Sequence, residues 1–411
     1  MPNSLKKQNK VGIIGGGQLG LMLADAAVPL GYKPVILAEN ADAPAAQVHR
    51  DVIIGAVEDR CVLDSLFAQV DRVVFENEFV DCEKLEQAAG GAIQFLPGLD
   101  VMRKIQDKLE QKILLRDLEI PSARYRVLDL MGDISVQLAK CFQEFPLGCV
   151  LKWSRLGYDG KGVLVLNAHP EGLGVASSDD LSEVQRFCEN AIRNRSSVYV
   201  EEKVAFQREL AVIGVFSIRG EFLSYPLVIS EQKQGICYRV YGPAESFGVD
   251  SAQTVAAKNY AYRIAKALGL YGSFGMEFFE TASGNLLVNE IAPRVHNTGH
   301  YTQDACDTSQ FENHWRAVLG LKLGEIHFSP GFAMLNILGP DIEVCAPGYP
   351  LPELGSSSHL HWYGKKKMRA RRKLGHLNAV FDSPEEVKQA LTDLEGCYQH
   401  WVSRLVEAGK G

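Results

Sequence analysis

The glycines Gly15, Gly17 and Gly20 stand between an apolar run and a helical pattern, in the stretch VGIIGGGQLG. Before them Val11–Ile14 is apolar, and after them apolar side chains recur at helical spacing for about three turns. A strand, a glycine turn and a helix in this order are typical of a β-α-β unit, whose strands lie parallel in one sheet. Because the same alternation continues to about residue 76, we expect the chain to begin with a parallel sheet covered by helices.

The pattern of apolar segments changes after about residue 120. From there, short strand-like segments follow one another at close spacing, which indicates an α+β region with mostly antiparallel strands. A smaller unit, also rich in strand-like segments, begins at about residue 331. The length of 411 residues fits two or three domains of roughly 150 residues each. We therefore predict three domains, at residues 1–120, 121–330 and 331–411.

The glycine turn alone does not identify a ligand. Glycines allow a tight turn, and the helix that follows offers backbone N–H groups to an anion. A dinucleotide site also needs an acid at the end of the second strand, and Glu39 stands there. NAD binding and a tight turn without any ligand therefore both stay open at this point.

A hairpin in MEFFETASGNLLVNE places two acids opposite one another. A turn centred on Ser283–Gly284 pairs residues symmetrically about it, so Glu277 faces Glu290. Like charges in this position are destabilising, with Cβ atoms roughly 5 Å apart, unless a cation lies between them. With Asn289 beside them, the two acids would suit a Mg²⁺ ion that also binds phosphates. The alternative is a pair of solvated acids on the protein surface.

A second glycine-rich stretch, LKWSRLGYDGKGV, also indicates a phosphate site. Gly157, Gly160 and Gly162 form a loop whose backbone can close over phosphates, and Lys152 on the preceding strand adds a positive charge. An ordinary hairpin loop with solvated ends is the alternative. Further along, VYVEEKV ends an apolar strand in two acids, and such a segment can bind an adenine through its backbone and a ribose through a carboxylate.

Composition narrows the possible partners and the compartment. The formal net charge of −7 argues against a general nucleic-acid or anionic membrane surface. No apolar run reaches the roughly 18 residues of a membrane span, and the first residues lack the apolar core of a signal peptide. The nine cysteines include no C-x-x-C pair, which is typical of reduced thiols. We expect a cytoplasmic protein with neither nucleic acid nor membrane as a partner.

A lysine strand, a glycine loop, an acidic segment and a pair of metal-binding acids, in this order, resemble the ATP-grasp fold. Longer stretches resemble one family with that fold, the 5-(carboxyamino)imidazole ribonucleotide synthases of purine biosynthesis. The resemblance covers nearly the whole chain and rests on GGGQLG, GYDGKG, NEIAPRVHNTGHYTQDACDTSQFENHWRA and LHWYGKKKMRARRKLGH. It implies an N-terminal Rossmann-like parallel-sheet domain, a central ATP-grasp domain and a small C-terminal β-rich domain.

The resemblance also implies a reaction. Members of this family convert ATP, bicarbonate and 5-aminoimidazole ribonucleotide into the carboxyamino ribonucleotide, ADP and phosphate, with carboxyphosphate as the intermediate. ATP and Mg²⁺ are then the expected cofactors, and the ribonucleotide and bicarbonate are the expected substrates. A homodimer is expected, and a separate carboxyaminoimidazole ribonucleotide mutase would receive the product.

By the same resemblance, the family's functional residues transfer to matching positions of this chain. Arg294, His296 and Asp159 are the expected catalytic residues, and the first two would hold bicarbonate. Glu277 and Glu290 would bind Mg²⁺. The residues expected to bind ATP are Lys108, Lys152, Gly157, Tyr158, Asp159, Gly160, Lys161, Gly162, Val163, Glu201, Glu202, Lys203, Val204, Glu209, Gln232, Asn289 and Glu290. Those expected to bind 5-aminoimidazole ribonucleotide, with the glycine turn facing this substrate instead of NAD, are Gly17, Gln18, Leu19, Glu76, Tyr158, Lys365 and Arg372.

The chain departs from the family's pattern at several positions. Lys108 stands where the family usually has an arginine and would serve a phosphate as a point charge. Gln232 replaces a frequent histidine, and Phe79 replaces a usual asparagine. The basic run KKKMRARRK is one residue longer than in some relatives, so either Lys365 or Lys366 would hold the phosphate of the ribonucleotide.

Three other activities stay open from the sequence. Another ATP-grasp ligase, such as formate-dependent glycinamide ribonucleotide formyltransferase, would share the ATP elements, but RRKLGH favours the synthase. An NAD-dependent oxidoreductase would use the glycine turn and Glu39, but it leaves the acid pair and the second glycine loop unexplained. A non-catalytic nucleotide sensor would not need the intact acid pair.

Overall fold

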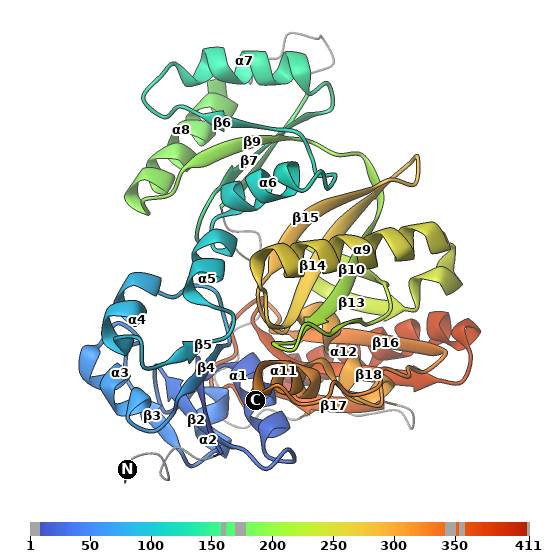
Figure 1. The fold of residues 1–411 in the computed structure, drawn as a ribbon. Helices are drawn as coiled ribbons and strands as arrows, with labels where there is room; N and C mark the ends of the chain where they lie inside the picture. The colour runs from blue at the N-terminus through green and yellow to red at the C-terminus, as the bar shows by residue number, and fades with distance from the viewer. Residues whose placement is uncertain (1–8, 158–161, 169–177, 342–350, 353–357, 409–411) are drawn as a thin grey trace.

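The computed structural model describes residues 9–157, 162–168, 178–341, 351–352 and 358–408 (Figure 1). The predicted loop residues Tyr158, Asp159, Gly160 and Lys161 lie outside these ranges. Within the described ranges, no helix combines the length and the apolar character that crossing a membrane requires.

The N-terminal part of the chain forms a five-stranded parallel sheet, as the alternation of strands and helices predicted. Along a strand of this sheet, successive side chains point to opposite faces of the sheet. Ile13 belongs to a buried cluster with Leu23, whereas Ile14 belongs to a cluster with Leu66 on the other face. Helices therefore cover both faces of this sheet (Figure 1). In spatial order the strands are β3 (Val52–Ile54), β2 (Lys33–Ala38), β1 (Lys10–Ile14), β4 (Arg72–Phe75) and β5 (Gln94–Phe95), and the helices are α1 (Gln18–Ala27), α2 (Pro44–Val48), α3 (Arg60–Phe67), α4 (Cys82–Ala89) and α5 (Leu99–Ile105).

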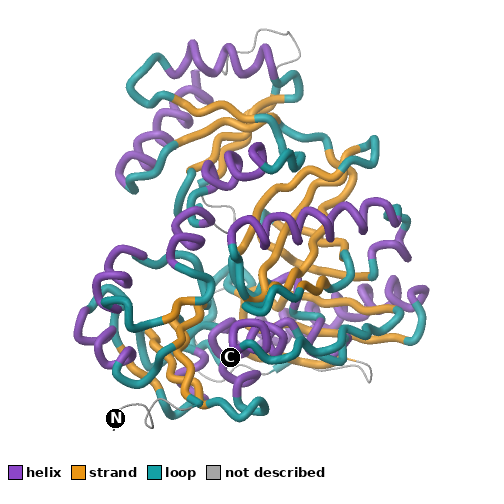
Figure 2. The backbone as a smooth tube through the Cα atoms, viewed as in Figure 1, coloured by secondary structure: helices purple, strands orange, loops and turns teal. Residues whose placement is uncertain are grey.

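A four-stranded antiparallel sheet with two helices forms a lobe at the top of Figures 1 and 2. Phe142, Leu151 and Val184 share its buried core, which packs the helices on one face of the sheet. A further helix, α6 (Lys108–Asp117), precedes this lobe in the chain. In spatial order the strands are β6 (Tyr125–Leu128), β9 (Val198–Glu202), β7 (Gly148–Trp153) and β8 (Val163–Asn167), and the helices are α7 (Ile134–Glu144) and α8 (Ser178–Arg193).

The described residues from 206 onward build a nine-stranded sheet in which neighbouring strands are antiparallel. Along the strand Phe206–Phe216, Val212 packs with Ile264 on one face of the sheet and Ile213 packs with Ala317 on the other, so helices cover both faces. In spatial order the strands are β15 (Leu286–Ala292), β14 (Gly272–Thr281), β10 (Phe206–Phe216), β12 (Val228–Lys233), β13 (Ile236–Gly242), β16 (Gly331–Leu338), β18 (Lys373–Phe381) and β17 (Ser358–Trp362), and β11 (Phe222–Ser224) pairs with β10; the covering helices are α9 (Ser251–Leu268) and α11 (Gln310–Leu319).

The C-terminal strands continue the central sheet, because β16 pairs directly with β13. Helix α12 (Val387–Ala408) buries Trp401 against Leu335 and Leu377 of these strands. On the N-terminal side, Trp315 of α11 donates a hydrogen bond to the Leu23 carbonyl of α1 (2.6 Å), which ties the central part to the first sheet. The predicted fold class, a parallel sheet followed by antiparallel α+β parts, is confirmed. The remaining short helices are η1 (Ala244–Phe247), η2 (Asn297–Gly299), α10 (Thr302–Ala305) and η3 (Pro384–Glu386).

Candidate active site

A cleft of about 740 Å³ lies where the three sheets meet. Gln18 of α1 and Glu76, directly after β4, line it from the N-terminal part. Lys152 lines it from the small sheet, and Glu277 and Lys373 line it from the large sheet. A cleft of this size at the junction of several parts of a chain suits a ligand of nucleotide size.

The glycine turn between β1 and α1 closes around the carboxyl group of Glu76, at the end of β4. The Gly17 N–H donates a hydrogen bond to this carboxylate. A Cβ atom at Gly15, Gly17 or Gly20 would lie only 2.6, 1.9 or 2.8 Å from a Glu76 atom, so the close approach requires all three glycines. The turn therefore holds a side chain of this protein where a dinucleotide site would hold a pyrophosphate.

The buried position of Glu76 disfavours its charged form relative to a carboxyl group in water. Burial raises the pKa of this carboxyl group to about 7, although the Gly17 N–H and the charges of Lys365 and Arg294 oppose that effect. A carboxyl group poised near neutrality at the edge of the cleft can either accept or donate a hydrogen bond to a polar ligand.

The hairpin of β14 and β15 places Glu277 opposite Glu290, as the sequence predicted. The symmetric pairing is wrong closer to the turn, where Phe279 pairs with Leu287 and the register shifts before the acid pair. The shift makes Asn289 the extra residue of a β-bulge, and a bulge redirects the side chains around it. Asn289 and Glu290 consequently both line the cleft.

The acid pair carries more negative charge than its neighbours neutralise. Lys108 lies at the start of α6, with its Nζ 3.1 Å from Glu290 Oε2. Burial, with further contributions from Glu290 and Glu209, still raises the pKa of Glu277 to about 7. The excess of negative charge is what a divalent cation would neutralise.

The donors present fit Mg²⁺, which takes oxygen ligands and commonly binds one or two carboxylates together with substrate phosphates. Glu277, Glu290 and the side-chain oxygen of Asn289 supply such oxygens. The described part of the chain contains no group of three or more His, Cys, Asp or Glu side chains that could hold a metal ion.

Lys152 is held in place by an acid that two lysines share. Its Nζ lies 2.6 Å from Glu201 Oε2, and Lys112 of α6 approaches Glu201 Oε1, also at 2.6 Å. Burial raises the pKa of Glu201, but the charges of Lys152 and Lys112 outweigh it, so the pKa lies below its ordinary value. Burial, with a further contribution from the charge of Lys152, lowers the pKa of Lys112, although Glu201 opposes this effect. Lys152 also donates to Asn289 Oδ1 (3.3 Å), which links the glycine loop strand to the acid pair.

Arg294 meets Glu78 in a buried two-pronged ion pair. Its Nε and Nη2 donate to the two carboxylate oxygens at 2.5 and 3.1 Å, and its Nη1 donates to the Val295 carbonyl at 3.2 Å. The carboxylate of Glu78 therefore occupies one edge of the guanidinium group, while both residues line the cleft. Any anion that Arg294 holds would have to use the remaining N–H groups.

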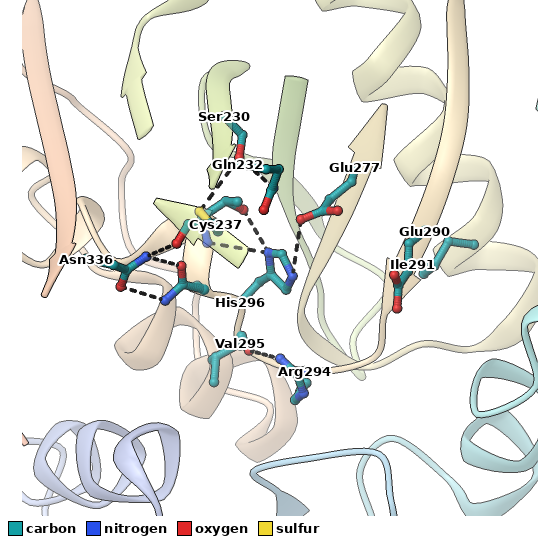
Figure 3. Close-up of polar contacts among 12 residues, drawn as sticks. Ser230, Gln232, Cys237, Glu277, Glu290, Ile291, Arg294, Val295, His296 and Asn336 are labelled. Atoms are coloured by element: carbon teal, nitrogen blue, oxygen red, sulfur yellow. Dashed lines mark hydrogen bonds and ion pairs between the residues drawn. The ribbon is translucent and has the colours of Figure 1, made fainter. Parts of the chain in front are cut away.

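In Figure 3, His296 lies between Glu277 on one side and Cys237 and Asn336 on the other. Its Nε2 is 3.8 Å from Glu277 Oε1, and its Nδ1 is 2.8 Å from Thr298 Oγ1. The Thr298 backbone N–H can only donate, so Nδ1 accepts and the ring proton lies on Nε2. Burial, followed by the charge of Arg294, lowers the pKa of His296 to about 3. The neutral ring thus offers an N–H donor to the cleft without carrying a charge.

Most of the other predicted ATP residues that the structure describes also line the cleft. Glu209 is half-buried within it, and burial raises the pKa of that carboxyl group to about 7. Gly162 adopts φ +67° against the ring of Trp153, where a Cβ would lie 2.9 Å from the ring, so this position of the loop requires glycine. Gly157 is buried at the start of the same loop. The further predicted residues that line the cleft are Leu19, Val163, Glu202, Lys203, Val204 and Gln232.

The residues of the basic run KKKMRARRK differ in burial and in the groups that they contact. Lys365 is buried and donates to Gln18 Oε1 and to the Lys373 carbonyl, both at 2.7 Å, so it reaches the glycine turn from the C-terminal part. Lys366 is exposed and pairs with Asp42. Arg372 donates to the Lys367 carbonyl (2.8 Å) within the same loop. Burial and position therefore favour Lys365 over Lys366 as the lysine that reaches the glycine turn.

Several cleft residues escaped the sequence analysis. Lys373, at the end of the basic run, lines the cleft, and so does Asn297 directly after His296. Phe79, noted only as a departure from the family, lines the cleft with its side chain 37% exposed. Lys112, which does not line the cleft but holds the cleft residue Glu201, was also missed, because no local pattern points to the carboxylate that it shares with Lys152. The position of Asn297 next to a predicted catalytic histidine was the one local signal that could have revealed it.

Comparison with known proteins shows matches to three domain families and to relatives that cover most of the chain. Residues 8–106 match the ribonucleotide synthetase preATP-grasp domain, residues 113–311 the ATP-grasp domain, and residues 333–390 the phosphoribosylaminoimidazole carboxylase C-terminal domain. An N5-carboxyaminoimidazole ribonucleotide synthase of Brucella melitensis is 38% identical over 377 residues, which span 92% of this chain and 98% of the relative. One of Synechocystis is 37% identical over 385 residues, spanning 91% and 92%. This chain belongs to the N5-carboxyaminoimidazole ribonucleotide synthase family.

Solved structures of the family agree with the fold. A synthetase of the family in its ADP complex has a TM-score of 0.82 at 32% identity, covering 96% of this chain and 98% of that one. A synthase of Aspergillus clavatus, in complex with ADP and 5-aminoimidazole ribonucleotide, has a TM-score of 0.81 at 30% identity, covering 96% and 99%. The family is the one that the motifs resembled, and its members are ATP-grasp ligases. The formyltransferase and NAD interpretations are not favoured.

Proposed function

We propose that this chain catalyses the ATP-dependent carboxylation of 5-aminoimidazole ribonucleotide with bicarbonate in purine biosynthesis, releasing ADP and phosphate. The observation that carries the proposal is that one cleft joins the acid pair to the glycine turn around Glu76. The Aspergillus clavatus relative, solved with ADP and 5-aminoimidazole ribonucleotide together, binds the two ligands that these two ends would take.

At one end of the cleft, this chain would hold ATP. Lys152 and Lys108 would bring positive charge to the phosphates. The segment from Glu201 to Val204, which also lines the cleft, would bind the nucleotide base and ribose. Mg²⁺, held by Glu277, Glu290 and Asn289, would neutralise the charge of the transferring phosphoryl group. Catalysis of this kind depends mostly on positioning and on charge stabilisation, and carboxyphosphate would form where Arg294 and His296 face the terminal phosphate.

At the other end, the ribonucleotide would lie along the glycine turn. Gln18 and Leu19 line the cleft there beside Glu76, and Lys365 reaches Gln18 from the C-terminal part. The neutral His296 N–H and the guanidinium of Arg294 would hold bicarbonate between the two substrates. We further propose a cytoplasmic homodimer whose product passes to a separate mutase.

An assay of ADP release tests the proposed function. With Mg²⁺ and ATP present, we expect release to require both bicarbonate and 5-aminoimidazole ribonucleotide, and we expect the carboxyamino ribonucleotide as the product. Each substrate is omitted in turn, and the product is identified by mass spectrometry in a cold, buffered quench. Equal ADP release without the ribonucleotide, or formylation of glycinamide ribonucleotide with formate, would contradict the proposal.

Lys365→Ala is expected to raise the KM for 5-aminoimidazole ribonucleotide by one to two decades while the KM for ATP changes much less. A charge-assisted contact to the phosphate of the ribonucleotide is worth roughly 1.5–3 kcal/mol, and that phosphate is a non-reacting handle for binding. Arg372→Ala should act in the same direction. Steady-state kinetics with each substrate varied separately measure the effect.

Lys366→Ala is the matched control, since Lys366 lies next to Lys365 but is exposed and paired with Asp42. Its KM values should stay within about twofold of the parent protein, because an exposed ion pair contributes little. An effect confined to ATP in the Lys365 variant would place the basic run at the wrong ligand.

A further inference from the structure

Asn336, in the middle of β16, is fully buried and holds two neighbours through its side-chain amide. Its Nδ2 donates to the Cys237 carbonyl oxygen at 2.9 Å and to Asn297 Oδ1 at 2.6 Å. Its Oδ1 accepts a hydrogen bond from Asn297 Nδ2 at 3.1 Å. In Figure 3, Asn336 and Cys237 lie on one side of His296, and Glu277 lies on the other.

These contacts allow only one orientation of each amide. A backbone carbonyl can only accept, so the nitrogen of Asn336 must face Cys237. The second proton on that nitrogen then points at Asn297, which must present its oxygen there. Cys237 thus fixes Asn336, and Asn336 fixes Asn297, without any contribution from a ligand.

The orientation of Asn297 matters because this residue lines the cleft directly after His296. Of its two Nδ2 protons, one is engaged by Asn336. If the amide rotated by half a turn, the donor and the acceptor that it presents toward the cleft would exchange places. A substrate oxygen next to His296 would then meet an acceptor instead of a donor.

Other side chains of the C-terminal strands β16, β17 and β18 bind the residues that follow Asn297. The ring of His376, which pairs with Asn336 across the ladder, stacks on His300 at 4.7 Å between ring centroids. Asp304 accepts from Asn378 at 2.6 Å and lies 2.7 Å from His361. The segment 296–305 is therefore bound along its length by side chains of β16, β17 and β18, and Asn336 is the contact at its cleft end.

We propose that Asn336 is a positioning residue for the carboxylation reaction, because its amide fixes the orientation of Asn297 beside His296. The expected effect on turnover rests on the proposed function, whereas the hydrogen bonds that orient Asn297 do not depend on it. Asn336 itself does not line the cleft, so it acts through Asn297.

Asn336→Asp tests the proposal with little change of shape. A carboxyl group carries at most one proton, so it cannot donate to both Cys237 and Asn297. We expect kcat to fall at least about 10-fold while the KM for ATP stays within about twofold, because misplacing a group at the reacting centre affects turnover more than nucleotide binding. An unchanged kcat, or losses explained by the fraction of unfolded protein, would overturn the proposal.

Asn313→Asp is the matched control. Asn313 is equally buried, and its amide contacts Tyr225 Oη (3.0 Å) and the Gly324 N–H (2.8 Å), but it does not line the cleft. Its variant should lose comparable stability and keep the kcat of the folded protein. Equal losses of kcat in the two variants would assign a general structural role to Asn336.

A double variant distinguishes action through Asn297 from direct action. If Asn336 acts only through Asn297, then Asn336→Asp should cost nothing further in an Asn297→Ala background. Additive losses would overturn the proposal.

Hydrogen exchange provides a readout that needs no substrate. In protein labelled with ¹⁵N-asparagine, the Asn297 side-chain amide protons should exchange at least about 10-fold faster in the Asn336→Asp variant than in the parent. Unchanged exchange would overturn the inference. If the parent protein shows no bicarbonate-dependent turnover, the proposed function fails, and the exchange measurement still decides the role of Asn336.

Discussion

Glu290→Gln is expected to reduce kcat by at least about 100-fold while the protein stays folded. The amide keeps the shape of the side chain but removes one of the two carboxylates that would bind Mg²⁺ over the phosphates. Losing one charged contact to a group where charge develops commonly costs two to three decades in turnover. Steady-state ADP release at a fixed, saturating ATP concentration, repeated over a series of Mg²⁺ concentrations, measures the loss.

The stability of the metal-free variant should change little, because two effects oppose one another. The variant loses the ion pair between Glu290 and Lys108, whose side chains are 34% and 19% exposed, and such a pair contributes at most about 1 kcal/mol. It also removes the repulsion that Glu290 exerts on Glu277. Glu221→Gln, at an exposed position before β11, serves as a control with unchanged activity and stability. Full turnover of the Glu290 variant at ordinary Mg²⁺ would remove Glu290 from the metal site, and loss of turnover together with unfolding would assign it a structural role.

The acid pair shows how far the sequence can predict a site. A symmetric turn at Ser283–Gly284 placed Glu277 opposite Glu290 because two departures cancel. The residues next to the turn pair one position away from the predicted register, and the bulge at Asn289 restores the predicted register at the acid pair. The bulge at Asn289 could not be predicted, because it depends on contacts from elsewhere in the chain. The Val288 N–H donates to the Pro121 carbonyl at 2.8 Å, and the Ile291 N–H donates to the side chain of Gln111 at 2.9 Å.

The glycine turn shows a different limit. Its spacing predicted a tight turn with backbone N–H groups available to an anion, and in the structure the Gly17 N–H donates to a carboxylate. What occupies the turn comes from the end of another strand, 59 residues after Gly17. No local pattern distinguishes a phosphate from a Glu76 carboxylate in this position, so the family resemblance, and not the spacing, excluded NAD.

Residues contributed by the C-terminal strands were the hardest to predict. Lys373 and Asn336 belong to strands that join the central sheet, and their proximity to the cleft depends on the pairing of β16 with β13. Sequence patterns predict strands far better than they predict which distant strands pair. The sequence predicted a C-terminal unit from about residue 331, and residues 333–390 match a C-terminal domain of the family.

Glu201→Gln is expected to lower the free energy of unfolding by about 3–5 kcal/mol, the largest stability effect that we expect from a single substitution in the cleft. Both Lys112 and Glu201 are almost fully buried, and the variant leaves Lys112 and Lys152 without their shared carboxylate. Removing one partner of a buried ion pair costs this much because the remaining charge stays out of water. Urea unfolding at pH 7 measures the difference.

The neighbouring strand residue provides the control. Glu202 pairs with Arg124 at 2.7 Å, with side chains 21% and 61% exposed, so Glu202→Gln should cost no more than about 1 kcal/mol. The difference in the free energy of unfolding between the Glu202→Gln and Glu201→Gln variants should also depend on pH. The folded-state pKa of Glu201 lies below the ordinary value of 4.5, so its ion pairs add stability above that pH and lose it as the pH falls through the folded-state pKa. The stability gap between the parent and Glu201→Gln should therefore narrow in acid.

A second substitution separates the loss of the carboxylate from the loss of packing. Lys112→Met replaces the buried lysine by an apolar chain of similar length, and it leaves Lys152 and Glu201 as a one-to-one pair. By itself this change should be nearly neutral, because burial and the competing charge of Lys152 already disfavour a charged Lys112. Combined with Glu201→Gln, it should recover about 2 kcal/mol, since only one buried cation then lacks a partner. If the double variant is as unstable as Glu201→Gln alone, the cost arises from packing around Glu201, and the shared carboxylate does not hold the two lysines in the way that the distances indicate.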